Sequence, residues 1–422
     1  MHTKRGRYFS WISRDGEIIL ATNGIRSFAY GFVSVILAIY LSNLGFDAFR
    51  IGITITLILV CGAFTTVLAS VYADRVGRRR FLFFTGMLMA VSGLIFALTS
   101  NTILILIGAL TGAMSPSGGD VSAFLSLEQA MLPQAGAKEK RHSIYATYNT
   151  AGQLAGAAGV LFSATPILFQ SSLHLGTTES YKPMFLIYSV LAIAMSVLYL
   201  MISSKMELQT AMQANGSGMK QISGMSHDSK TIIAKFSSLL AVDALAGGFV
   251  IQTIISYWFY TKFSVPLEYL SLVFFATGIF SSLSLLIAGR LADRIGAINT
   301  MFFTHLPANV LLILVPIAPT FPLALSLYVT RALITQMDVP ARQAYTVSVV
   351  RPHERTAASG ITNISRNIAR IPSPTIAGYA LQFVSLALPF FIAGTIYTLS
   401  DSILYLSFRK VKERVEEESQ QR

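Results

Sequence analysis

The chain has 422 residues, of which 53% are hydrophobic and only 12% are charged, and its mean hydropathy is +0.60. This composition excludes two or three soluble domains, because soluble proteins carry about twice that share of charged residues. The net charge of +12 resembles that of nucleic-acid-binding proteins, but the basic residues flank apolar segments instead of forming one patch. The sequence therefore predicts a polytopic membrane protein without a nucleic-acid partner.

Apolar segments long enough to cross a bilayer as helices recur along the whole chain. We expect twelve of them, at residues 18–42, 49–72, 81–98, 101–132, 143–168, 182–203, 231–260, 268–290, 298–317, 321–350, 355–383 and 387–408. An even number places both termini on one side, and most Lys and Arg residues flank that side. Only Arg50, Lys182 and Lys262 lie in the opposite loops. By the positive-inside rule both termini are cytoplasmic, and we expect a plasma-membrane protein in contact with anionic lipid.

The longest polar stretch, residues 204–230, is rich in Ser, Gly, Met and Gln, which is typical of a flexible linker. The sequence on one side of it recurs on the other: residues 73–77 (ADRVG) as 292–296 (ADRIG), Glu128-Gln129-Ala130 as Arg342-Gln343-Ala344, and Asn149 as Asn363. We therefore expect two duplicated six-helix bundles, residues 1–203 and 231–422, the second with a short cytoplasmic tail. Such repeats usually hold a substrate between the halves, near the middle of the bilayer.

Residues 70–80 (SVYADRVGRRR) resemble the signature that the major facilitator superfamily carries after its second helix, and residues 289–296 (GRLADRIG) resemble its degenerate second copy. The resemblance covers essentially the whole chain. It implies an all-α membrane protein with twelve transmembrane helices in two pseudo-symmetric six-helix bundles. The general pattern looks closest to the drug and sugar efflux branch, although the helix-four Arg and helix-five Gly-Pro pair of many efflux members are absent.

In the superfamily the aspartate of this loop latches the two halves in one conformational state. The resemblance therefore implies a conformational switch formed by Asp74, Arg75, Gly77, Arg78, Asp293 and Arg294. The residue types fit this role, because a carboxylate can pair with neighbouring guanidinium groups and glycine permits a tight turn. The alternative is a basic loop that only sets topology.

Ionisable residues inside the expected helices are costly in a bilayer, so each is a candidate functional residue. They are the acids Asp120, Glu128, Asp243, Asp338 and Asp401 and the arginines Arg26, Arg331, Arg342, Arg366 and Arg370. The equal numbers favour pairing, because an unpaired buried charge is far costlier than a pair. At about 100° per residue, Arg331, Asp338 and Arg342 share one face of the tenth helix. We expect Arg331, Asp338 and Arg370 to form charge pairs.

The other charges have two interpretations. They are structural salt bridges, or they carry protons and bind substrate, since a carboxylate in a low-dielectric cavity takes up a proton that an approaching Arg releases. We expect Glu128, Asp120 and Asp243 to carry protons. The expected cavity residues are Arg26, Tyr30, Phe124, Tyr148, Asn149, Arg342, Asn363 and Arg366. His305 is interpreted as a packed polar residue, and no His, Cys or carboxylate set has metal-ligand spacing.

Backbone breaks are expected near the same charges. Residues 115–120 (SPSGGD) should open helix four, and Pro340, Pro372 and Pro374 should break or kink helices ten and eleven. In helix five, Gly152, Gly156 and Gly159 are spaced for close helix packing.

The sequence thus predicts a secondary transporter, not an enzyme, because neither a nucleophile–base set nor a GxxxxGK[ST] phosphate loop is present. We expect a monomer without cofactors that moves a small organic solute by alternating access, with proton-coupled efflux by antiport favoured. The alternatives are a proton symporter or a facilitator for a sugar or organic anion. A transport-dead receptor or an assembly subunit is the alternative from another class.

Overall fold

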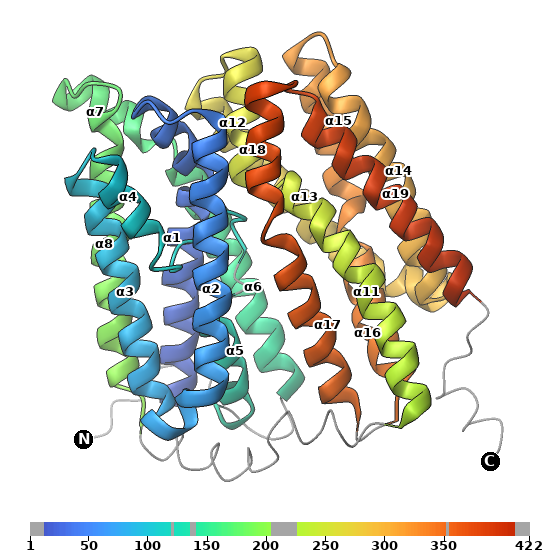
Figure 1. Cartoon of the computed structure of the whole chain (residues 1–422). Helices are drawn as coiled ribbons and strands as arrows, with labels where there is room; N and C mark the ends of the chain where they lie inside the picture. The colour runs from blue at the N-terminus through green and yellow to red at the C-terminus, as the bar shows by residue number, and fades with distance from the viewer. Residues whose placement is uncertain (1–11, 120–121, 136–140, 204–225, 352–353, 410–422) are drawn as a thin grey trace. The chain divides into compact units, whose positions relative to one another are not determined.

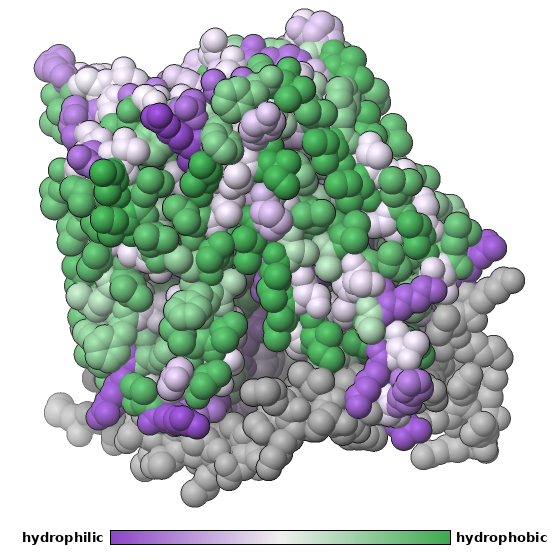
Figure 2. Space-filling model, viewed as in Figure 1, coloured by the Kyte–Doolittle hydropathy of each residue, from purple (hydrophilic) through white to green (hydrophobic). Residues whose placement is uncertain are grey.

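A computed structural model of the chain describes residues 12–119, 122–135, 141–203, 226–351 and 354–409 (Figure 1). The regular elements in these ranges are helices, as predicted. Nine helical spans in the described ranges are long and apolar enough to cross a membrane. Large apolar side chains such as Phe64 and Phe84 are exposed along them. Figure 2 shows hydrophobic residues covering the sides of the helices and hydrophilic residues near their ends.

The helices of the N-terminal half are α1 (Arg14–Asn43), α2 (Ala48–Val76), α3 (Arg78–Leu98), α4 (Thr102–Ala109), α5 (Ala123–Met131), α6 (Arg141–Phe162), α7 (Thr165–Leu173) and α8 (Lys182–Leu200), with short 3₁₀ turns η1 (Leu132–Gln134) and η3 (Glu179–Tyr181). Those of the C-terminal half are α11 (His227–Phe249), α12 (Gln252–Phe263), α13 (Leu267–Ile295), α14 (Ala297–Leu314), α15 (Phe321–Thr335), α16 (Asp338–Ser348), α17 (Arg355–Arg370), α18 (Ser373–Phe383) and α19 (Leu388–Phe408), with η4 at Val315–Ile317. Taken in order they form the twelve expected spans.

Five of these spans consist of two helices separated by a break, and three of the breaks lie where the sequence predicted them. The fourth consists of α4 and α5, the tenth of α15 and α16, and the eleventh of α17 and α18. Each piece is too short to cross a bilayer alone, so these three spans are not among the nine long helices. Pro340 lies in the first turn of α16, and Pro372 directly precedes α18. A proline there removes a backbone donor and clashes with the preceding turn, so the upstream helix ends.

The two copies of the Asp-Arg-x-Gly pattern form the same backbone turn. Gly77 separates α2 from α3 with φ 99°, and Gly296 separates α13 from α14 with φ 84°. Only glycine adopts this region without strain. The duplication read from the sequence is therefore also a duplication of local structure.

Contacts divide the chain into two compact units. Unit 1 contains the residues up to Val33 and Cys61–Asn215, and unit 2 contains Ser34–Val60 and the residues from Gly216 on. In unit 2, the end of α1 contacts α12, where Thr253 Oγ1 donates to the Ser34 carbonyl at 2.8 Å. The start of α2 packs on α18 so closely that a Cβ added to Gly52 would lie 2.3 Å from the Pro374 carbonyl oxygen.

Within unit 1, glycine brings α1 and α6 into close contact, as predicted. A Cβ added to Gly159 would lie 2.0 Å from the Phe28 carbonyl oxygen, whereas one added to Gly156 would lie an ordinary 3.6 Å from the Ser27 carbonyl oxygen. We expect Gly159→Ala to destabilise the fold by about 1–3 kcal/mol, because backbone atoms must separate. Thermal melting of the purified protein in detergent measures this.

Gly156→Ala is the matched control, one turn away on the same helix. It should melt within about 0.5 kcal/mol of the parent protein, as substitutions without steric conflict do. Equal melting of the two variants would contradict the close packing of α1 on α6.

Candidate functional site

A fully buried ion pair lies inside unit 1, formed by Glu128 of α5 and Arg26 of α1. Arg26 Nη2 donates to Glu128 Oε2 at 2.6 Å, and Arg26 Nη1 donates to Oε1 at 2.9 Å. Three hydroxyl groups also donate to this carboxylate: Tyr148 at 2.6 Å, Tyr199 at 2.6 Å and Thr22 at 2.9 Å. A carboxylate that accepts this many hydrogen bonds is well satisfied as an anion.

Buried aromatic and polar side chains surround this pair. Phe124, also fully buried, stacks on Tyr199, and the Arg26 guanidinium lies 5.1 Å from its ring centroid. Arg26 also donates to the Asn23 side chain at 3.2 Å. Tyr30 is 1% exposed. Arg26 and Glu128 thus join α1 to α5, with α6 and α8 contributing the two tyrosines.

A second polar cluster lies inside unit 2 around His305 of α14. Its Nε2 lies 3.2 Å from Asp338 Oδ1 of α16, and its Nδ1 lies 3.3 Å from Asp401 Oδ2 of α19. Arg342 pairs with Asp338 from the next turn of α16. When both ring nitrogens carry protons, His305 can pair with both carboxylates, and loss of one proton leaves one carboxylate without that partner.

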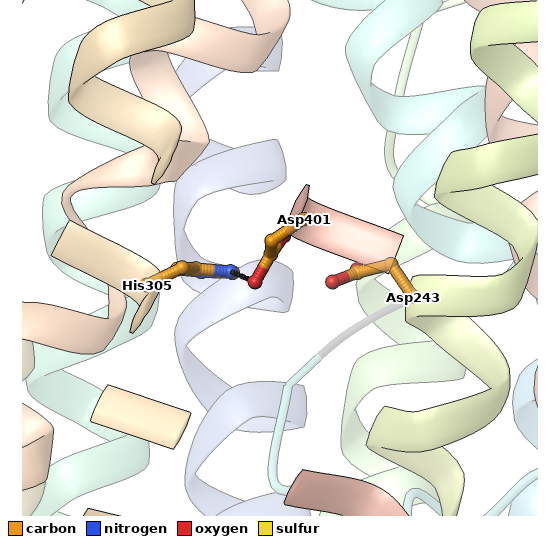
Figure 3. A group of neighbouring side chains, drawn as sticks. All are labelled: Asp243, His305 and Asp401. Carbon is orange, nitrogen blue, oxygen red and sulfur yellow. Dashed lines mark ion pairs between the residues drawn. The ribbon is translucent and has the colours of Figure 1, made fainter. Parts of the chain in front are cut away.

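Three further side chains complete this cluster. Asn309 Nδ2 donates to Asp401 Oδ2 at 2.8 Å, and Arg366 Nη2 of α17 lies 3.8 Å from Asp243 Oδ2 of α11. Figure 3 shows Asp243 and His305 approaching Asp401 from opposite sides. The cluster therefore connects five helices of unit 2 through charged groups that are largely removed from water.

Asp243, His305 and Asp401 offer ligand atoms within 4.8 Å of one another, a donor set that a divalent cation can use. The charges nearby favour a proton at this position instead. Arg342 and Arg366 already pair with acids of the cluster, and a doubly charged ion would add to their positive charge. A single proton on His305 matches the available carboxylates without such repulsion.

Two arginines of unit 2 differ from the others. No carboxylate oxygen of the described residues lies within 4 Å of Arg331 or Arg370, and the buried Nε of each has no hydrogen-bond partner there. Asp338 pairs with Arg342, whereas no such pair is found for Arg331 or Arg370 among the described residues. The reason lies in the backbone: α15 ends at Thr335, and the break before Asp338 takes Arg331 out of helical register with α16.

The loop after α2 contains the expected charge contact. Arg78 Nε donates to Asp74 Oδ1 at 2.7 Å, and Arg79 donates to the Ile202 carbonyl at 3.1 Å. In the second copy Ala297 occupies the place of Arg78, and no ion pair of Asp293 is found among the described residues. Arg75 and Arg294 are exposed.

The sequence did not indicate that the carboxylate of Glu354 caps a helix start. Glu354, in the turn before α17, accepts hydrogen bonds from Ser229 Oγ at 2.6 Å and from the backbone of Ser226 at 2.6 Å, which fixes the start of α11. Burial alone would raise the pKa of Glu354, but these hydrogen bonds and one from Arg351 lower it to about 2.

We expect Glu354→Gln to lower the melting temperature at neutral pH, since hydrogen bonds to a charged group contribute about 1.5–3 kcal/mol. The depressed pKa makes this contribution complete above the ordinary carboxyl value of 4.5 and lost as the pH falls toward 2. Melting curves between pH 7 and pH 3 should therefore converge at the acid end. Glu268→Gln, an exposed acid at the start of α13, is the control. A Glu354→Gln deficit that is constant down to pH 3 would contradict this role.

With this geometry described, comparison with known proteins identifies the family. The sequence model of the Major Facilitator Superfamily matches residues 19–335 and 237–422. The chain belongs to the major facilitator superfamily. It is therefore a multi-pass membrane protein of a transporter family and not an enzyme.

Individual relatives of this superfamily member are distant. It is 26% identical over 97% of both chains to the uncharacterized membrane protein YJR124C of Saccharomyces cerevisiae. Its fold is similar to that of the nucleoside transporter NupG, with a TM-score of 0.69, 13% identity and coverage of 94% of this chain and 100% of that one. For the xylose transporter XylE from E. coli the TM-score is 0.68, with 14% identity and coverage of 94% and 96%. These likenesses show the fold alone.

The structure brings some of the predicted site residues together and separates others. Arg26, Phe124, Tyr148 and Glu128 form one cluster, and Asp243, Asp338, Arg342 and Arg366 form another. Asn149 and Asn363 are exposed. Asp120 lies outside the described residues.

Three residues of these clusters were missed by sequence reasoning. His305 was interpreted as packing, and Asn309 and Tyr199 were not considered. A signal was available for His305 and Asn309, which are four residues apart on one face of an apolar helix, but their carboxylate partners lie on other helices.

Proposed function

We infer that this superfamily member is a secondary active transporter that moves a small organic solute by alternating access and couples that movement to protons. The observation that supports coupling is the position of His305 between Asp338 and Asp401, at 3.2 Å and 3.3 Å. Ionisable groups placed inside a membrane protein at such cost commonly form proton relays. The membership of a transporter family supports solute movement.

Gain or loss of a proton by this cluster can change the contacts between its helices. His305 belongs to α14, Asp338 to α16 and Asp401 to α19. When His305 loses a proton, either Asp338 or Asp401 loses a charge partner, and the contact that holds those helices together weakens. Asp243, paired with Arg366 at 3.8 Å, has a carboxylate oxygen within 4.8 Å of His305 and Asp401 and can take up the proton in turn.

In this proposal Glu128 has a different role from the proton carrier expected from the sequence. Its carboxylate is fully buried and already accepts five hydrogen bonds, two of them from Arg26. A group that exchanges protons needs a path to water at some stage. We propose that Glu128 anchors the helices of unit 1 and that His305 with Asp243 carries the proton.

The test is proton movement in proteoliposomes that contain a pH-sensitive dye. Organic cations, sugars and organic anions are added outside, one at a time, and liposomes without protein are the control. At least one solute should change the internal pH through the protein. Acidification with entry of the solute indicates symport, and alkalinisation indicates the antiport favoured by the resemblance to efflux transporters. Transport of labelled solute without any pH change would exclude coupling.

We also propose that both termini are cytoplasmic and that the monomer is the functional unit. The two six-helix halves, residues 1–203 and 231–422, would move about the linker at residues 204–230. Asp74, which pairs with Arg78 inside the first half, would then be a residue of the conformational switch. An N-terminal tag reached by antibody only after the plasma membrane is permeabilised supports this topology, whereas labelling of intact cells contradicts it.

A further inference from the structure

The charges inside unit 2 do not balance. Three acids, Asp243, Asp338 and Asp401, are each within 4 Å of a cationic group, namely Arg366, Arg342 and His305 respectively. Arg331 and Arg370 remain as two further positive charges, and no carboxylate oxygen of the described residues lies within 4 Å of either. A cation inside a membrane protein without a counter-charge is expensive, so such a pair indicates a negatively charged ligand.

Both arginines lie close to the end of a helix that stops at a break. Arg370 is the last residue of α17, Arg331 lies in the last turns of α15, and Gly247 lies in the last turn of α11. A Cβ added to Gly247 would lie 2.7 Å from the Tyr397 hydroxyl and 3.9 Å from Arg370 Nη2. Asp243 acts electrostatically on that same hydroxyl, as do Arg331, Arg370 and Arg366, so three cations and one carboxylate surround it. The two guanidinium groups therefore act on a common region beside Tyr397.

The side chains around this region suit an organic anion. A guanidinium group binds a carboxylate through two parallel hydrogen bonds, and two such groups can hold one or two acidic groups. The Tyr397 hydroxyl can donate a further hydrogen bond. Tyr328, one turn before Arg331, packs against Phe259 and Phe274, so aromatic rings lie on the same helix as this arginine and next to it.

We propose that Arg331 and Arg370, with Tyr397, bind the acidic group of a small organic anion, which is the solute of the proposed transporter. This assignment rests on the proposed function, and it names the substrate class of the same unit. It differs from the expectation from sequence, in which Arg26, Arg342 and Arg366 faced the solute. Those three are paired with Glu128, Asp338 and Asp243. Because an anion moving with a proton transfers less net charge, this substrate class favours symport.

Binding can be measured without transport. The purified protein is melted in detergent with acetate, benzoate, succinate, citrate or phenyl phosphate, and with acetamide, benzamide and succinamide at matched ionic strength. At least one acid should raise the melting temperature saturably while its amide does not.

Arg331→Gln and Arg370→Gln should each weaken binding of that acid at least tenfold, and the Lys variants should weaken it less. Arg290→Gln, an exposed arginine at the end of α13, should bind as the parent protein does.

The outcomes separate this proposal from the proposed function. Saturable binding of neutral amides alone, no binding of any acid, or unchanged binding in both Gln variants would overturn the anion site. In those cases proton flux evoked by a sugar or a cation would still support coupled transport. Variants that fail to fold are recognised by gel filtration, and Tyr397→Phe, which removes one hydroxyl, then tests the site with a smaller change.

Discussion

Glu128→Gln is expected to lower the free energy of unfolding by about 3–5 kcal/mol and to leave little folded protein. The substitution removes a charge partner from Arg26, which is 0% exposed, and an uncompensated buried charge costs this much. It also replaces one carboxylate oxygen by an NH2 group. At least one of the hydroxyl groups that donate to Glu128, those of Tyr148 and Tyr199, would then face a donor instead of an acceptor. Yield and melting temperature in detergent measure the effect.

A double variant separates structure from proton transfer. Arg26→Gln with Glu128→Gln removes both charges together, so it should be less destabilised than the sum of the single variants, by an interaction energy of about 1–3 kcal/mol. Glu179→Gln, which removes an exposed ion pair with Lys182, should be nearly neutral. If Glu128→Gln folds and melts as the parent protein does but abolishes proton flux, Glu128 is the proton carrier that the sequence suggested.

His305→Gln is expected to reduce the accumulation of solute that a pH gradient drives by at least about tenfold. Exchange of labelled for unlabelled solute should continue. Glutamine can still hydrogen-bond but cannot gain or lose a proton near neutral pH. Asp338 and Asp401 then no longer alternate between paired and unpaired states, so the proton gradient has no means of acting on α14, α16 and α19. Both activities are measured in the same proteoliposomes.

His227→Gln, at the exposed start of α11, is the matched control and should retain both activities. Asp338→Asn should behave like His305→Gln but with lower stability, because Arg342 also loses its partner. Coupled accumulation that survives His305→Gln unchanged would exclude this cluster as the coupling site.

The fold could be predicted from the sequence because its determinants are local. Apolar length gave the spans, prolines and glycines gave the breaks in the fourth, tenth and eleventh spans, and Gly159 gave the close packing of α6. The turns at Gly77 and Gly296 followed from one repeated pattern. Each of these signals is contained within a short stretch of chain.

The charge partners could not be predicted, because helical periodicity gives a face but not the helix opposite. Helical periodicity placed Arg331 and Asp338 on one face of the tenth helix, and the break between Thr335 and Asp338 removes that register. Arg26, Arg342 and Arg366 were taken to face a solute, yet each is paired with an acid. His305 lacked any local sign of its two carboxylates, which lie 33 and 96 positions later.

The most direct test of coupling is accumulation of a labelled solute in proteoliposomes under an imposed pH gradient without a membrane potential. The protein should drive the internal concentration above the external one, and collapsing the gradient with a protonophore should return it to equality. Reversing the pH gradient should reverse the direction of solute accumulation. Equilibration to equal concentrations whatever the gradient would contradict proton coupling and would show the protein to be a facilitator.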